Sequence, residues 1–332
     1  MANSSIVYPW QQSLWQHLVG YIEQQRIPQA LLITGATGMG KRHLADAFAQ
    51  VLLCQNPLPG YLVCGACHGC HLWHAQTHPD YLLIEPDEPG KAIGIDKIRQ
   101  LIVKLALKPQ FDTQRLVIIQ PADQLNNASA NAFLKCLEEP TERTSFILLT
   151  DKPTRLPATI RSRCQSVHCQ LPDRQLAGQW LQQQGVNEDY DLLLRFAQGA
   201  PLLAKQYADQ HFIDLRQKYF NDWLQVFEGK QNLVTLAELW QKQDKLDLAV
   251  LLTWMTSWVM DIIKSAHQAD VDKLHNPDMK KSLQALAERL ELKRVYKFYD
   301  NLLNAQSQVS KQVNKQLLLE QLLINWTQLN TR

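Results

Sequence analysis

Four of the seven cysteines lie close together in the sequence, at a spacing that is typical of metal ligands. They follow the pattern C-x9-C-x2-C-x2-C and are Cys54, Cys64, Cys67 and Cys70. Four thiolates complete the tetrahedral coordination of Zn²⁺ and leave no position for a reacting water. The sequence therefore predicts a structural zinc site that stabilises a module at about residues 54–70.

Two alternatives concern the same module. One nearby histidine could replace a thiolate, although we favour solvated loop positions for all four: His68, His71, His74 and His78. A zinc ribbon that binds nucleic acid is the second alternative, but residues 57–80 contain no Lys or Arg to contact phosphates. The other cysteines are interpreted as small core residues: Cys136, Cys164 and Cys169.

A second chemical motif is the glycine-rich segment 35–42, with the sequence GATGMGKR. Such a loop between a strand and a helix surrounds phosphate with backbone N–H groups, and its lysine adds a positive charge. The candidate nucleotide-binding residues are Gly35, Gly38, Gly40 and Lys41. The next position is normally Ser or Thr, whose hydroxyl binds Mg²⁺, but here it is Arg42, which cannot ligate a cation.

The second magnesium ligand is missing as well. It should be a carboxylate at the tip of a later apolar strand, next to a Glu that orients the attacking water. That strand is predicted at residues 115–119, but Gln120, Pro121 and Ala122 follow it, and Asp123 comes only after them. We therefore predict a degenerate P-loop and favour a plain strand-to-helix turn over weak nucleotide binding. The chain is not expected to use ATP or Mg²⁺.

The elements that position these residues change in kind along the chain. In the first half, short apolar runs predict strands, and the segments between them have helical spacing. The strands are expected at 30–34, 81–84, 116–119, 146–150 and 165–168, and the helices at 41–53, 96–107 and 128–139. This alternation indicates a parallel sheet that is covered on both faces.

The second half has almost continuous helical spacing, because only Gly229 and Pro277 interrupt it after residue 201. A chain of 332 residues is also long for one hydrophobic core. We predict an α/β domain with the zinc module at residues 1–170, a small helical lid at 171–208 and an all-α domain at 209–332.

Composition and charge restrict the location and the partners. A net charge of +2 is too small to indicate DNA binding by itself. The first ten residues lack a basic start followed by an apolar stretch, and the most apolar run, 248–260, is shorter than the roughly 20 residues that span a bilayer. Cysteines at metal spacing indicate a reducing compartment. We expect a cytoplasmic protein without a membrane partner.

A resemblance gives a role to one further residue. Ser162, Arg163 and Cys164 form a Ser-Arg-Cys motif that resembles the motif of clamp-loader subunits in the AAA+ family. Segments 35–41, 77–80 and 131–140 and the four clustered cysteines resemble the same family in the same order, and 314–320 is similar to its final collar helix. The resemblance implies a RecA-like AAA+ domain, a lid and a helical collar for oligomerisation.

The resemblance also implies a mechanism. Arg163 would be an arginine finger that acts on ATP held by a neighbouring subunit, since its planar fork neutralises charge on a γ-phosphate. The loss of both magnesium ligands, and of an arginine at 199–203, is similar to the family member that does not hydrolyse ATP. Its partners would be the gamma or tau ATPase subunits and the delta subunit. The assembled complex would load the sliding clamp on primed DNA during replication.

Two other functions remain as alternatives. One is an active gamma-type clamp-loader ATPase with an unusual metal site, and the other is a zinc-dependent DNA-binding module that acts alone. No polymerase active-site pattern is found in the sequence. The resemblance therefore implies membership of the DNA polymerase III holoenzyme, classed as a DNA-directed DNA polymerase, without catalysis by this chain.

Overall fold

The structure of the protein is a computed structural model that describes residues 7–111, 114–139, 141–242, 247–268, 270, 273–308 and 314–330. The chain divides into two compact units, residues 1–206 and 207–332. The predicted lid, 171–208, belongs almost entirely to the first unit, and the three-part division stays a prediction. The expectation about a signal segment falls partly on residues 1–6, which lie outside the described residues.

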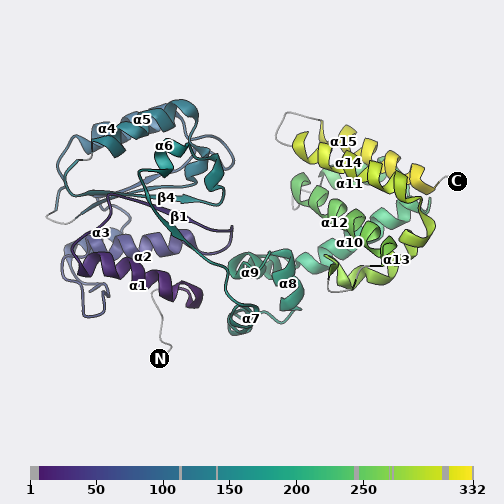
Figure 1. Ribbon diagram of the computed structural model, residues 1–332, viewed down its shortest axis with the longest axis horizontal. Coiled ribbons are helices and arrows are strands. Elements are labelled where there is room, and N and C mark those ends of the chain that lie inside the picture. Colours follow the sequence, from purple (N-terminus) through teal and green to yellow (C-terminus); the bar gives the residue numbers. More distant parts are fainter. Residues whose placement is uncertain are drawn as a thin grey trace. The chain divides into compact units, whose positions relative to one another are not determined.

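A five-stranded parallel sheet forms the centre of the first unit (Figure 1). The strand order is β2-β3-β4-β1-β5, and every pair of neighbours is parallel. The strands are β1 (Ala30–Thr34), β2 (Tyr81–Ile84), β3 (Arg115–Ile119), β4 (Thr144–Thr150) and β5 (Gln165–His168). This sheet confirms the predicted parallel α/β arrangement.

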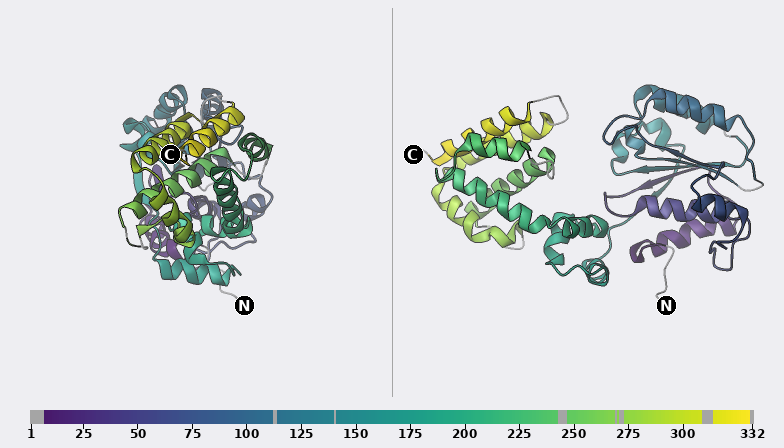
Figure 2. Two further views of the ribbon diagram at one scale, coloured as in Figure 1. Left: turned by 90° about the vertical axis from the view of Figure 1, so that its right-hand side faces the viewer. Right: turned by 180° about the vertical axis from the view of Figure 1, so that it is seen from behind.

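Helices cover both faces of this sheet. Figure 1 shows α1, α2 and α3 on one face and α4, α5 and α6 on the other, and Figure 2 shows the same layers from behind. Their bounds are α1 (Gln12–Glu23), α2 (Lys41–Leu53), α3 (His68–His74), α4 (Ile95–Leu105), α5 (Asn127–Glu138) and α6 (Ala158–Arg161). Short 3₁₀ turns lie at Pro9–Gln11, Ala122–Gln124 and Pro153–Arg155.

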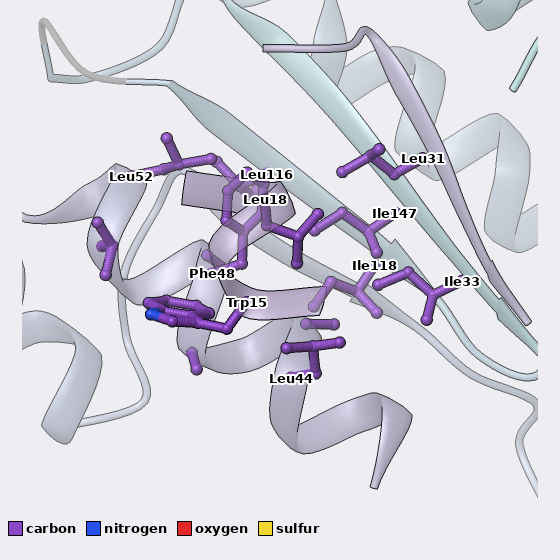
Figure 3. Packing of buried hydrophobic residues seen from close by; sticks show 14 of the residues in the cluster. Trp15, Leu18, Leu31, Ile33, Leu44, Phe48, Leu52, Leu116, Ile118 and Ile147 are labelled. Atoms are coloured by element: carbon purple, nitrogen blue, oxygen red, sulfur yellow. The ribbon is translucent and has the colours of Figure 1, made fainter. Parts of the chain in front are cut away.

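The central strands contribute to two separate cores, because successive side chains of a strand point to opposite faces. Leu31 and Ile33 of β1 pack on the side of α1 and α2, whereas Ala30 and Leu32 pack on the side of α4 and α5. The first of these cores is shown in Figure 3 with Trp15, Leu18, Leu44, Phe48, Leu116, Ile118 and Ile147. Burial on both faces explains why β1, β3 and β4 each contain a continuous apolar run.

Three short helices follow the sheet: α7 (Arg174–Gln183), α8 (Tyr190–Phe196) and α9 (Pro201–Asp209). Gly185 and Gly199 separate them with φ angles of +78° and +84°, a backbone conformation that favours glycine. The two glycines therefore end α7 and α8 and separate the three helices.

Two predictions about the elements need correction. β4 begins at Thr144, two residues before the predicted start, because Thr144 and Ser145 pair with β3 and are buried although they are polar. Helix α1 was not predicted, although Trp15 and Leu18 follow helical spacing and are buried.

The second unit contains six helices within the described residues: α10 (Phe212–Phe227), α11 (Leu233–Lys242), α12 (Leu248–Ala266), α13 (Lys280–Arg289), α14 (Leu292–Gln308) and α15 (Lys315–Thr327). They confirm the predicted all-α region. Short 3₁₀ turns lie at Pro277–Met279 and Gln328–Asn330. Among the described helices, α12 is long and apolar enough to cross a membrane, but 56% of its apolar window is buried inside the protein, as in an ordinary core helix.

The last helix of the second unit is joined to α10 by two tryptophans. The rings of Trp223 and Trp326 stack with their centroids 3.7 Å apart, and neither side chain is exposed. The indole N–H of Trp326 donates a hydrogen bond to the carbonyl oxygen of Trp223 over 3.1 Å.

We predict that Trp326→Ala lowers the free energy of unfolding by about 3–5 kcal/mol, because it opens a cavity beneath α15. Urea unfolding followed by circular dichroism measures the change. Leu317→Ala in the same helix is the control, since that side chain is 62% exposed, and it should change the stability by no more than about 0.5 kcal/mol. Equal effects of the two substitutions would show that the stacked pair does not anchor the helix.

Candidate functional site

The P-loop segment joins the end of β1 to the start of α2, the context that the motif requires. Thr34 is the last residue of the strand and Lys41 is the first residue of the helix. Gly38 and Gly40 have φ angles of +80° and +78°, so the loop uses its glycines for left-handed turns. The predicted residues Gly35, Gly38, Gly40 and Lys41 are thus brought together in one loop.

The lysine of this loop is held by the chain itself. Its side chain is 8% exposed, and Nζ donates hydrogen bonds of 2.8 Å to the carbonyl oxygens of Gly35 and Ala36. Nζ also forms an ion pair with Asp151, which directly follows β4. The hydroxyl of Thr37 donates to the other oxygen of Asp151 over 2.5 Å. The charge of Lys41 is therefore balanced without any external anion.

Two other segments of the first unit pack directly on the loop. A Cβ on Gly40 would lie 2.7 Å from the ring of Tyr8, and a Cβ on Gly38 would lie 2.6 Å from the side chain of Leu203 in α9. The carbonyl oxygen of Met39 accepts hydrogen bonds from the side chains of Trp10 and Gln11, at 3.0 and 2.8 Å. The loop is therefore packed from two sides by other segments of the first unit.

Arg42 occupies the position whose hydroxyl would bind Mg²⁺. Its guanidinium donates to Asp46 at 2.7 Å, to Glu85 at 3.2 Å and to the phenol oxygen of Tyr81 at 3.0 Å. It also donates to Gln120, directly after β3, over 3.4 Å. Burial and then the Asp46 carboxylate raise the pKa of the Tyr81 phenol, so this group stays protonated. The permanent positive charge of the Arg42 guanidinium is therefore surrounded by side-chain oxygens at the carboxyl ends of the strands.

The four clustered cysteines also come together. Sγ–Sγ distances of 3.6 Å (Cys54 to Cys64 and to Cys70), 3.8 Å (Cys64 to Cys70) and 3.9 Å (Cys54 to Cys67) link the four thiols. Tetrahedral coordination with Zn–S bonds of about 2.3 Å requires sulfurs about 3.8 Å apart. The cluster is therefore compatible with a tetrahedral metal ion, and no fifth residue is needed to complete it.

The backbone around the cluster stabilises thiolates. The N–H groups of Cys67 and Cys70 point at the sulfurs of Cys64 and Cys67, at 3.3 and 3.4 Å. Burial opposes ionisation of Cys67, but the amide groups of Cys70 and Gln55 lower its pKa to about 6. Burial, followed by the neighbouring thiols, raises the pKa of Cys70 to about 12. Metal binding must therefore displace a proton from Cys70 at neutral pH.

The nearby histidines do not join this group, but His68, His71 and His74 lie in helix α3 and not in a loop as predicted. Among the residues that the structure describes, the four cysteines are the one set of Cys, His, Asp and Glu side chains close enough to share a metal ion. His78 is buried, and its Nδ1 accepts the N–H of Asp80 over 3.2 Å. Burial lowers the pKa of His78. The carboxylate of Asp80 accepts hydrogen bonds from the N–H groups of Gln110 and Phe111 at 3.0 Å. Segment 77–80 therefore holds the backbone at residues 110–111 in place.

Arg163 lies at the opposite edge of the sheet from the P-loop. It follows α6 and precedes β5 by two residues, and its side chain is 39% exposed. A Cβ on Gly35 would lie 2.7 Å from the backbone of Cys169, directly after β5. The strand between Cys169 and Arg163 spans roughly 15–20 Å at the usual rise per residue. Arg163 is therefore not brought to the P-loop of its own chain.

Two contacts hold this arginine. One terminal nitrogen forms an ion pair with Glu138 of α5 over 2.8 Å, and the other donates to the carbonyl oxygen of Thr159 over 3.0 Å.

Three residues of these sites were not predicted from the sequence: Glu138, Thr37 and Asp151. For Asp151 a signal was available, because it follows a predicted strand and the carboxyl ends of parallel strands meet at one edge.

The fold and the loop define the class of protein: an AAA+ domain with a P-loop after the first strand, followed by a separate helical unit. Family models described as "DNA polymerase III, delta subunit" and "DNA polymerase III, delta subunit, C terminal" match residues 10–173 and 210–328. The DNA polymerase III subunit delta' of Pseudomonas aeruginosa is 35% identical over 97% of this chain and 98% of its own. The chain belongs to the delta' family of DNA polymerase III subunits.

Further similarities extend this comparison. The delta' subunit of Escherichia coli K12 is 32% identical over 96% of this chain and 94% of its own length. Among solved structures, a gamma subunit-related protein from Thermotoga maritima aligns with 97% of this chain and 100% of its own, at 19% identity and a TM-score of 0.49.

We predict that the purified protein carries about one equivalent of tetrahedrally bound metal and that Cys67→Ser removes most of it, since three thiolates bind more weakly than four. Native mass spectrometry measures the metal, and thermal unfolding measures the accompanying loss of stability. Cys164→Ser lies outside the cluster and should keep the metal. A parental protein without metal, or equal metal content in both variants, would contradict the site.

Proposed function

We propose that this chain is the non-hydrolysing subunit of a DNA polymerase III clamp loader and that Arg163 completes an ATP site on a neighbouring subunit. The position of Arg163 carries the proposal. The side chain is partly exposed, fixed by Glu138 and Thr159, and separated from its own P-loop by the length of the sheet. An arginine in this position serves a nucleotide of another molecule, where its fork stabilises charge on the γ-phosphate.

The proposed lack of ATP hydrolysis rests on the electrostatics of the P-loop edge. Arg42 replaces the hydroxyl ligand of Mg²⁺, and Gln120 replaces the carboxylate at the end of β3. The guanidinium of Arg42 pairs with Glu85 and Asp46, so these carboxylates are already engaged by a positive charge. The retained glycines and Lys41 favour the alternative of an active gamma-type ATPase, but they supply no metal ligand.

The relatives named delta' support the choice of partners. We propose assembly with gamma or tau ATPase subunits and a delta subunit through the helical unit. Several large apolar side chains remain partly exposed on this unit, as expected of surfaces that other subunits cover: Val234, Leu239, Tyr296, Leu303, Leu317 and Ile324. The sliding clamp and primed DNA would be reached through the complex, in the cytoplasm at the replisome.

We further propose that the metal of the cysteine cluster is Zn²⁺ and that its role is structural. Four thiolates are a typical ligand set for structural zinc, and they leave no coordination position for water. Cys54 directly follows α2 and Cys67 directly precedes α3, so the ion would connect the P-loop helix to the module that follows it. Metal binding would thereby contribute directly to folding of this part of the chain.

Arg163→Ala should leave folding and assembly of the loader intact but lower turnover at the adjoining ATP site by about 10³-fold or more, the usual contribution of an arginine finger. Steady-state ATP hydrolysis by the reconstituted complex, with assembly checked by gel filtration, measures this. Arg161→Ala removes the same charge two residues away, from an exposed side chain, and should retain the parental rate. An assembled Arg163 variant that hydrolyses ATP at the parental rate would refute the role in trans.

The isolated chain should show no ATP turnover above background with Mg²⁺, and Arg42→Thr should not create it, because Gln120 still supplies no carboxylate. A coupled ATPase assay of the purified chain measures both. Turnover that Lys41→Ala abolishes would instead establish the gamma-type alternative.

A further inference from the structure

The P-loop of this chain already contains an anion, the carboxylate of Asp151. One of its oxygens pairs with the ammonium of Lys41, and the other accepts the hydroxyl hydrogen bond of Thr37 over 2.5 Å. The carboxylate thus bridges the lysine and a residue of the loop itself. In P-loops that bind nucleotides, the lysine reaches the outer phosphates of the ligand.

The sheet positions the carboxylate of Asp151 beside the P-loop. Asp151 directly follows β4, the neighbour of β1 in the sheet, and the P-loop directly follows β1. Thr34 and Thr150 are register partners at the ends of these two strands. The backbone therefore brings Asp151 beside the loop, and little movement of the side chain is needed to reach Lys41.

Lys41 requires such a partner. Its side chain is 8% exposed, and the two carbonyl oxygens that it also contacts carry only partial charges. A buried ammonium without a counter-charge is strongly unfavourable, so the carboxylate supplies what a bound phosphate would otherwise supply.

We propose that Asp151 is the internal ligand of this loop and occupies the place of an outer phosphate. The P-loop is then an anion site filled by its own chain, which excludes free phosphates by charge repulsion. Removal of the Asp151 charge would convert the loop into a site for a small polyphosphate anion, without any need for Mg²⁺. This inference deepens the proposed function in one respect, since it gives the reason why the loop holds no nucleotide.

The packing above the loop determines the size of the ligand. Tyr8 and Leu203 lie against Gly40 and Gly38, so a ligand larger than the phosphates themselves would meet side chains of the same chain. A compact anion without a base avoids this obstacle. Inorganic pyrophosphate is therefore the appropriate probe.

The test compares pyrophosphate binding by the full chain and by Asp151→Asn, using isothermal titration calorimetry in EDTA. Asn keeps an acceptor for Thr37 and removes the charge. We expect at least about tenfold tighter binding by the variant, together with a lower melting temperature that pyrophosphate raises more than in the parental chain. Adding Lys41→Ala to the variant should abolish the gained binding.

Asp123→Asn is the matched control, because Asp123 bonds to the hydroxyl of Thr150 at the same edge of the sheet. It should bind pyrophosphate as weakly as the parental chain. Should Asp151→Asn fail to fold, Asp151→Ser provides a second variant: it removes the same charge with a smaller polar side chain and should also bind pyrophosphate more tightly than the parental chain.

Equal affinities of Asp151→Asn and the parental chain would overturn the inference, and so would an equal gain in Asp123→Asn. Neither result concerns Arg163, so the proposed function would stand. Conversely, tight Mg·ATP binding by the parental chain would refute both the lack of nucleotide use and the internal ligand.

Discussion

The common direction of all five strands is the constraint on which the arrangement of the site depends. A parallel sheet places every carboxyl end at one edge and every amino end at the other. The P-loop, Gln120 and Asp151 follow strands and meet at the first edge, whereas Arg163 precedes a strand and lies at the second. No side-chain rotation can bring that arginine to the loop. This geometry supports the proposal that Arg163 acts on a second polypeptide.

At the P-loop edge, two side chains carry charges of the kind that a metal ion and a phosphate would bring. Arg42 puts a guanidinium near the place of the divalent cation, and Asp151 puts a carboxylate beside the lysine that would meet a phosphate. The two side chains carry opposite charges. The glycine turns of the loop and its packed lysine are therefore accompanied by charged partners from the chain itself.

Features that depend on local sequence were predictable, and features that depend on distant pairs were not. Four cysteines within 17 residues are close enough in sequence to predict their own cluster. The apolar runs of β1 and β2 predict the first and the last residue of each strand. β4 begins as early as Thr144 because Thr144 and Ser145 pair with β3. Their polar side chains give no sign of this pairing in the sequence. The contact of Thr37 with Asp151 joins residues 114 positions apart. Only the strand order makes it foreseeable.

The energetics of Arg163 indicate that its role is not stability. Its ion pair with Glu138 is between side chains that are 39% and 49% exposed, and such pairs contribute about 0.2–1 kcal/mol. Arg216 in the helical unit is different, because it is fully buried and bonds to Asp278 over 2.7 Å, so its loss would cost about 3–5 kcal/mol. The fold needs the second arginine and gains little from the first. An exposed, weakly stabilising arginine held in one orientation fits the proposal that Arg163 meets a neighbouring subunit.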